Sequence, residues 1–74
     1  MLTISVTDMK GSQNVREVQS VWKVKGEHGN YLVQYWIKDC TIPNTVTEGD
    51  VYVMNDNGKT VAYYHLMPRG YTGV

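Results

Sequence analysis

The stretch NDNGK, residues 55–59, carries the clearest local structural signal in this chain. It lies between two apolar runs, VYVM at 51–54 and TVAYYHL at 60–66. An Asn-Gly pair between runs of β-branched and aromatic residues is a strong short-range signal for a β-hairpin. The sequence therefore predicts two antiparallel strands within residues 50–66. The question that it leaves is which face of this hairpin is buried.

Two registers are compatible with this turn. A two-residue loop pairs Tyr52 with Tyr63, whereas a type I turn with a bulge at Gly58 pairs Val53 with Val61. We prefer the bulged turn, because only the glycine then needs a positive φ. A slip of one residue moves every side chain of a strand to the other face, so the register decides which residues form the core.

Both faces of the hairpin are apolar in either register. In the preferred register we expect one face, the buried one, to hold Val51, Val53, Val61 and Tyr63. The opposite face then holds Tyr52, Met54, Ala62, Tyr64 and Leu66. A sheet with one face in water should alternate apolar with polar residues, so the second apolar face needs a cover. Either the C-terminal tail or the 39–49 loop folds over it, or a second protein chain does.

The rest of the chain also predicts strands. Residues 2–7, LTISVT, alternate as a half-buried strand, and YLVQYWIK at 31–38 alternates in the same way. The run VREVQSVWKVK at 15–25 fits both helical spacing and strand alternation. We favour a strand there, because its four valines lose rotamer freedom in a helix. Residues 15–17 are then either a bulge or a short preceding strand. With the glycine-bounded turn GEHGN at 26–30, residues 18–38 form a second predicted hairpin.

Composition supports an all-β fold. Among 74 residues there are eleven Val, seven Thr, six Tyr and two Trp, against one Ala, three Leu and no Phe. These residue types fit a pleated, half-buried surface. We expect a single small β domain over residues 1–66, followed by a flexible tail at 67–74. Its architecture is expected to be a five- or six-stranded SH3-like or OB-like barrel, or a twisted antiparallel sheet.

Residues 47–66, TEGDVYVMNDNGKTVAYYHL, resemble a hairpin of SH3-like small β-barrels, in which Gly-Asp leads into a Val-x-Val strand, a turn and a return strand. The resemblance covers about a quarter of the chain and implies a fold. It carries no binding residues with it. In its brevity and neutral charge the whole chain resembles small accessory proteins of bacteriophages and mobile elements, which often bind and inhibit a host protein.

Residues suited to catalysis or metal binding are few. Cys40 and His65, with Asp39 beside the cysteine, are the one combination that suggests a nucleophile and a base, and no oxyanion-hole motif accompanies them. The single cysteine and two histidines, His28 and His65, lack zinc-site spacing. We therefore expect a non-enzymatic protein without cofactor or metal, and a structural role for Cys40.

The chain is expected to work inside a cell. Seven basic residues balance seven acidic ones, so no overall charge attracts nucleic acid. The lone cysteine cannot pair within the chain, and no apolar run approaches the roughly 20 residues of a membrane span. We expect a cytoplasmic protein, in the host cytoplasm if it is viral, with no membrane partner.

The expected function is protein binding, either to a second copy of the chain as a homodimer or to a host protein such as a defence protein. The expected binding residues are Trp36, Tyr52, Met54 and Tyr64, which converge if the two hairpins share one sheet. The alternative is binding of single-stranded nucleic acid by stacking on aromatic side chains beside a basic strip. The residues for that alternative are Trp22, Lys23, Lys25 and Lys38.

Overall fold

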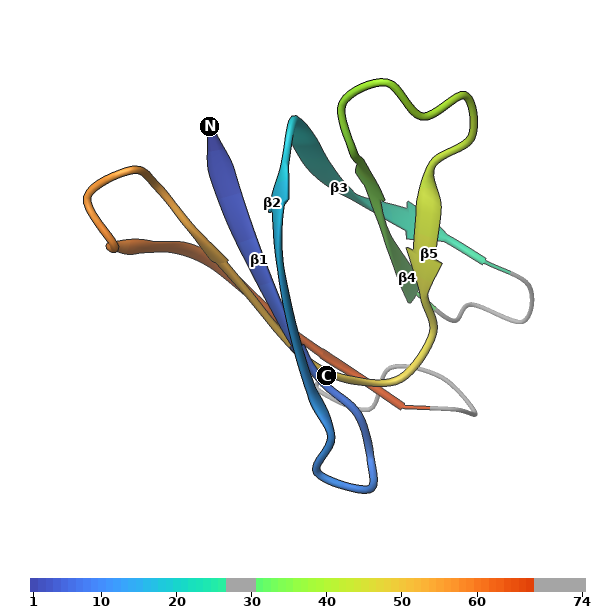
Figure 1. Cartoon of the computed structure of the whole chain (residues 1–74). Coiled ribbons are helices and arrows are strands. Elements are labelled where there is room, and N and C mark those ends of the chain that lie inside the picture. Colours follow the sequence, from blue (N-terminus) through green and yellow to red (C-terminus); the bar gives the residue numbers. More distant parts are fainter. Residues whose placement is uncertain (27–30, 68–74) are drawn as a thin grey trace.

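The computed structural model describes residues 1–26 and 31–67, which form seven β-strands and no helix. The strands are β1 (Leu2–Thr7), β2 (Gln13–Val18), β3 (Ser20–Lys25), β4 (Tyr31–Trp36), β5 (Asn44–Val46), β6 (Gly49–Met54) and β7 (Thr60–Leu66). Figure 1 shows them as two sheets, with the hairpin of β6 and β7 in yellow to red. The expected all-β fold is confirmed.

Every neighbouring pair of strands is antiparallel. The first sheet has the order β2-β1-β6-β7, and the second sheet has the order β3-β4-β5. Only Gln19 separates β2 from β3, so one length of chain passes from the first sheet into the second. The backbone N–H of Gln19 donates to the carbonyl oxygen of Trp36, 2.7 Å away, which fixes this crossing point.

The core lies between the two sheets and takes residues from both. Its buried apolar side chains are Ile4, Val18, Val33, Tyr35, Val46, Val51, Val53 and Leu66. Five of them belong to the first sheet and three to the second. Side chains alternate along a strand, so the residues directly before and after each of these core residues face the outer side of the sheet.

The strand count is the first correction. Seven strands replace the expected five or six, because residues 13–25 form two strands and residues 44–46 form a third within the predicted 39–49 loop. The helical alternative for residues 15–25 is wrong. A three-residue strand is too short to show alternation in a sequence, and β5 is held by pairing with β4, where Val46 lies opposite Val33.

Residues 1–26 and 31–67 do not close into a barrel. The first and second sheets are two separate sets of hydrogen-bonded strands. The predicted turn at 26–30 and the predicted tail at 67–74 fall almost entirely outside the described residues.

The turn between β1 and β2 is built by Asp8. Its backbone N–H donates to the carbonyl oxygen of Ser12, and its side-chain Oδ1 accepts from the backbone N–H groups of Lys10 and Ser12, each at 2.9 Å. Gly11 has a φ of 90° and donates its N–H to the carbonyl oxygen of Asp8. This is a type I turn closed by a glycine in the left-handed region.

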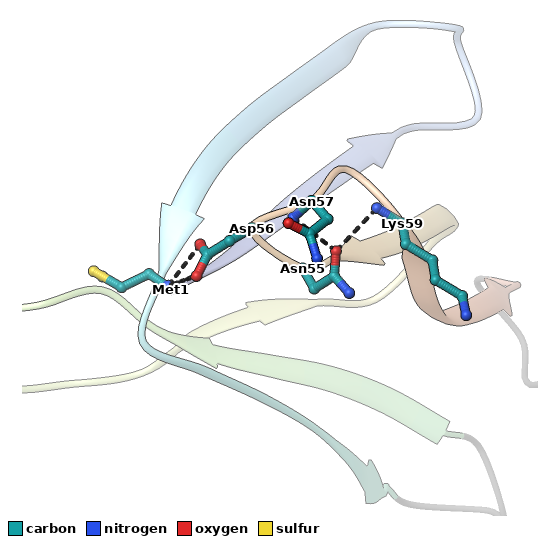
Figure 2. A network of polar contacts seen from close by, with 5 residues as sticks. All are labelled: Met1, Asn55, Asp56, Asn57 and Lys59. Atoms are coloured by element: carbon teal, nitrogen blue, oxygen red, sulfur yellow. Dashed lines mark hydrogen bonds and ion pairs between the residues drawn. The ribbon is translucent and has the colours of Figure 1, made fainter.

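The turn between β6 and β7 repeats this construction, as Figure 2 shows. Asn55 takes the place of the aspartate, and its Oδ1 accepts from the N–H groups of Asn57 and Lys59 at 2.9 and 3.0 Å. Gly58 has a φ of 77° and donates to the carbonyl oxygen of Asn55. The predicted turn with a positive φ at Gly58 is confirmed.

Beyond the turn, however, the preferred register is wrong. Met54 pairs with Thr60, as the bulged turn requires, but the next pair is Val53 with Ala62. Val61 is therefore a second bulge, and it returns the hairpin to the register of the two-residue loop. The buried side of the hairpin consequently holds Val51, Val53, Ala62, Tyr64 and Leu66.

Candidate protein-binding surface

The outer face of the first sheet carries three rows of paired residues that run across all four strands. The middle row is Val15, Ser5, Tyr52 and Tyr63. The row on one side is Gln13, Thr7, Asp50 and His65, and the row on the other is Glu17, Thr3, Met54 and Thr60. We call these three rows the outer face.

Two tyrosines occupy the β6 and β7 positions of the middle row. The rings of Tyr52 and Tyr63 have centroids 4.7 Å apart and planes inclined by 37°. Their residues remain 41% and 49% exposed. On the other half of the row, Val15 is 57% exposed, and Ser5 is buried beneath Gln13, whose Nε2 donates to its Oγ at 3.0 Å.

A carboxylate holds one of these tyrosines in place. Oδ1 of Asp50 accepts a 2.7 Å hydrogen bond from the hydroxyl of Tyr63 and lies 2.7 Å from Nδ1 of His65. These two contacts, that of His65 first, hold the pKa of the Asp50 carboxyl below its usual value. The carboxylate is therefore charged in neutral solution, and the Tyr63 ring has one anchored end.

A second polar contact ties the start of the chain to the β6–β7 turn (Figure 2). The amino group of Met1 lies 2.8 Å from Oδ1 and 3.0 Å from Oδ2 of Asp56. This hydrogen bond raises the pKa of the amino group. Both groups are well exposed, so the pair contributes little to stability.

The four residues expected to bind a protein do not lie on one surface. Tyr52 and Met54 are on the outer face, whereas Tyr64 packs against the core. Trp36 belongs to the second sheet. The expected convergence required both hairpins to share one sheet, and it fails because the chain changes sheets at Gln19.

Sequence reasoning missed Tyr63 and Val15 as outer-face residues. Tyr63 was placed in the core by the register without the Val61 bulge. Nothing in TVAYYHL marks Val61 as a bulge, because both phases of this run place apolar residues on both faces. Val15 was missed because residues 15–17 were expected to be either a bulge or a short preceding strand, and no sheet face was assigned to them.

The tryptophans lie on the outer side of the second sheet. Trp22 and Trp36 have ring centroids 6.3 Å apart and planes inclined by 30°. Nε1 of Trp22 donates to Oε1 of Gln34 at 3.1 Å, and Nε1 of Trp36 donates to the carbonyl oxygen of Cys40 at 2.8 Å. Both indole N–H groups are therefore satisfied within the chain.

The lysines expected beside these tryptophans are not on the same side. Lys23 and Lys25 alternate with Trp22 along β3, so they point to the opposite side of the strand. Nζ of Lys23 lies 4.5 Å from the centroid of the Tyr31 ring. Lys38 is exposed in the segment after β4. The predicted basic strip along the tryptophans is therefore divided between two sides.

Cys40 and His65 belong to segments of different sheets. Cys40 is exposed after β4 of the second sheet, whereas His65 lies in β7 of the first sheet beside Asp50. Within residues 1–26 and 31–67, no group of three or more His, Cys, Asp or Glu side chains is placed to hold a metal ion. The same part of the chain shows no pocket. His28 lies outside the described residues.

None of the described residues belongs to a helix long and apolar enough to cross a bilayer.

No protein-family model, curated protein or solved structure matches this chain. The outer face, with its exposed tyrosine pair, is the surface that differs most from an ordinary solvated sheet.

Proposed function

We propose that this chain is a non-enzymatic protein-interaction module that binds its partner through the outer face, with Tyr52 and Tyr63 as anchors. The observation that carries the proposal is the tyrosine pair, 41% and 49% exposed, at the centre of three rows of side chains. Tyrosine is enriched in the buried centres of protein interfaces and among the residues that dominate binding energy.

The tyrosines suit this role because they are already ordered. Asp50 fixes the hydroxyl of Tyr63, and the ring of Tyr63 in turn limits where Tyr52 can move. An ordered side chain loses little conformational entropy on binding, so more of its contact energy is available for affinity. The polar residues of the two flanking rows would form the rim of the interface.

The partner is proposed to be either a host protein or a second copy of the chain. A homodimer through the outer face would cover both tyrosine pairs at once, and a host partner agrees with an accessory or inhibitory role of the bacteriophage type. The cytoplasm is the proposed compartment, because the one cysteine, Cys40, is an exposed free thiol. We also propose that the two sheets form an open relative of the SH3-like small barrels that residues 47–66 resemble.

The test compares two variants of the tagged protein. Tyr52→Ala/Tyr63→Ala removes the anchors, and Lys23→Ala/Lys25→Ala alters exposed residues of the second sheet. If the partner is a host protein, the first variant should bind it about 30-fold or more weakly than the unaltered protein does. If the partner is a second copy, self-association measured by light scattering should weaken by the same factor. The lysine variant should bind as the unaltered protein does. Equal binding by both variants would contradict the proposal.

The stacked indoles of Trp22 and Trp36 favour one second candidate, binding of single-stranded nucleic acid. The division of the lysines between two sides counts against it, because phosphate contacts supply most of the affinity of such proteins. A labelled oligonucleotide titrated over a salt series tests it. Binding that falls steeply with salt and is lost in Trp36→Ala would support this candidate over the first.

A further inference from the structure

We infer that a second copy of this chain pairs with the open edge of β2, strand against strand, so that two four-stranded sheets join into one. This inference goes beyond the proposed function, because it concerns an edge of the sheet and leaves the outer face available. It comes from the direction of the backbone groups of β2, from the exposure of its side chains and from the charges that would face one another.

The hydrogen bonds of the β1–β2 hairpin show which backbone groups of β2 point outward. The N–H of Asp8 donates to the carbonyl oxygen of Ser12, and bonded and non-bonded pairs alternate along an antiparallel hairpin. Counted from this pair, the even-numbered residues of β2 bond with β1. The N–H and C=O groups of the odd-numbered residues therefore point away from β1, and these residues are Gln13, Val15 and Glu17.

Gln19 gives independent evidence for this direction. It is the next odd-numbered residue after Glu17, and its N–H donates to the carbonyl oxygen of Trp36 in β4. β4 thus occupies the outward side of the strand at Gln19. Before that point, no strand within residues 1–26 and 31–67 pairs with this side, because β2 is the last strand of its sheet.

The side chains of β2 leave the same edge open. All five residues from 13 to 17 are exposed, whereas Val18 is buried. Two of these exposed residues, Asn14 and Arg16, lie on the same side of the first sheet as Val18 and the core. The second sheet therefore stops short of β2 at these positions, and another strand has room beside it.

The other sheet edges are less suited to strand pairing. β3 carries Lys23 and Lys25, β5 has three residues, and β7 is interrupted by the bulge at Val61. β2 has six residues that pair with β1 in unbroken register. It carries two charges, those of Arg16 and Glu17, so a strand that joins it must place suitable groups opposite both.

A second copy of β2 meets this requirement. Antiparallel pairing about a two-fold axis at Val15 places Gln13 of each copy opposite Glu17 of the other. It also places Asn14 opposite Arg16. Amide side chains then face both charges, and no like charges are opposed. All the outward-pointing backbone groups of the three odd-numbered residues find partners in this one register.

Neighbouring registers lack this match. A two-fold axis at Arg16 would place two arginines directly opposite each other, and one at Asn14 would place Glu17 opposite Gly11 of the turn. The axis at Val15 also covers that side chain, which is 57% exposed in the single copy. Because the axis is perpendicular to the sheet, the two outer faces lie on the same side and form one surface.

Sedimentation velocity over a concentration series tests this pairing with two variants of Val15. Val15→Pro removes the outward N–H, which a strand at the edge of a sheet can lose without breaking its bonds to β1. Val15→Thr keeps the N–H and a branched side chain. We expect the dissociation constant of the dimer to rise about tenfold or more in Val15→Pro and to stay within about threefold in Val15→Thr.

A second pair of variants tests the register and does not disturb the backbone. Gln13→Glu places a carboxylate opposite Glu17 of the second copy, whereas Gln13→Lys places a cation there. Both variants lose the bond from Gln13 to Oγ of Ser5, so they are matched within the single copy. Self-association should weaken about fivefold in Gln13→Glu and should not weaken in Gln13→Lys, and added salt should reduce this difference.

NMR of a mixture of labelled and unlabelled protein identifies the paired residues directly. Isotope-filtered spectra should show contacts between the α-protons of Asn14 in one copy and Arg16 in the other, because this pair is a closely spaced non-bonded pair.

Four results would overturn the inference. They are a monomer at millimolar concentration, equal self-association of Val15→Pro and Val15→Thr, equal effects of the two Gln13 variants, and self-association that is lost only in Tyr52→Ala/Tyr63→Ala. The last result would place the contact between copies on the outer face and would support the proposed function. A monomer would also leave the proposed function intact, because a host protein can still bind the outer face. A dimer through β2 in which the tyrosines bind nothing would confirm the inference while the proposed function fails.

Discussion

The hairpins β1–β2 and β6–β7 are closed by the same turn, but only the first keeps one register along its whole length. In both turns a side-chain oxygen of the first residue accepts two backbone N–H groups, and a glycine at the fourth position has a positive φ. The first hairpin then pairs without interruption from Thr7 with Gln13 to Leu2 with Val18. The second is shifted by one residue at Val61.

This difference shows that the turn alone does not determine which face of a hairpin is buried. An uninterrupted second hairpin would have placed Tyr63 opposite Val51 in the core. The bulge instead aligns Ala62, Tyr64 and Leu66 with the buried valines of β6 and turns Tyr63 outward beside Tyr52. The proposed binding surface therefore depends on a single extra residue in β7.

The largest expected effect is at Gly49, where the second hairpin meets the turn of the first. Gly49 has a φ of 103°, and a Cβ there would overlap the carbonyl oxygen of Thr7. Backbone on both sides prevents relief of this overlap. We expect Gly49→Ala to lower the free energy of unfolding by at least about 3 kcal/mol, measured by urea denaturation.

The control for this change is Gly58→Ala, which has a positive φ but nothing within 4 Å of an added Cβ. If the two glycine variants were equally stable, the close approach of the hairpins at Thr7 would be wrong.

The next effect separates the two registers of the second hairpin. Tyr64→Ala removes a ring packed on the core, so it should cost about 2 kcal/mol or more of folding stability. Tyr63→Ala removes an exposed ring and should cost about 1 kcal/mol or less. The reverse order in thermal or urea denaturation would restore the register without the bulge.

Deleting one residue from each hairpin tests the bulge directly. Without Val61, Thr60 and Ala62 become neighbours and the pairing on both sides of the bulge becomes continuous, so stability should change by no more than about 1 kcal/mol. Deleting Val15 from the uninterrupted β2 should cost about 2 kcal/mol or more, because the turn at Asp8 can no longer close in register. Urea denaturation of the two deletion variants measures the difference, and contacts between the Tyr52 and Tyr63 rings by NMR should persist without Val61.

Because the two turns have the same construction, replacing the glycine of either turn should lower stability by the same amount, and by less than the changes described above. Gly11 and Gly58 both have positive φ and open space around an added Cβ. Alanine at either position should lower stability by about 1 kcal/mol through backbone strain alone. A difference in unfolding free energy much larger than the error of the measurement would show that the turns are not interchangeable.

The smallest expected effect is a pH dependence of folding stability that arises from Asp50 in the second hairpin. Contacts with His65 and Tyr63 lower the pKa of Asp50, so the folded protein keeps this carboxylate charged at pH values where the unfolded chain binds a proton. The stabilisation is complete above the ordinary aspartate pKa of about 4 and disappears as the pH falls through the lower, folded-state pKa. The stability difference between the unaltered protein and Asp50→Asn should shrink accordingly in urea titrations at falling pH.

Tyr63→Phe serves as the matched variant, because it removes one of the two contacts and keeps the ring. The pH dependence of its stability should lie between that of the unaltered protein and that of Asp50→Asn. A stability difference that grows with acidity would contradict the assigned direction.

Much of the fold follows from local sequence. The alternation of LTISVT and the Asn-Gly turn predicted β1 and the β6–β7 hairpin, and composition predicted the all-β class. The turn DMKGS could also have been recognised, because it shares with NDNGK an Asp or Asn at its first position and a glycine at its fourth.

Features that depend on distant contacts could not be predicted. The strand Asn44–Val46 exists through its pairing with β4, and the change of sheets at Gln19 depends on a bond to Trp36. Asp50 contacts Tyr63 and His65 only in the observed register of the β6–β7 hairpin, which the sequence did not reveal. For this reason the candidate site was half predicted, with Tyr52 and Met54 on the outer face and Trp36 and Tyr64 elsewhere.

The central position of β1 in the first sheet has a consequence for how the protein folds. β1 pairs with β2 through a short turn, but its other partner is β6, so that Thr3 lies opposite Met54. Contacts between residues so far apart in sequence are slow to form, because a long loop must close before they are gained. On the ribosome, β1 and β2 can emerge as a hairpin early, yet one edge of β1 stays unpaired until β6 has been synthesised. We therefore expect the pairing of β1 with β6 to be the late step of folding, and a chain interrupted before residue 54 to expose an edge prone to aggregation.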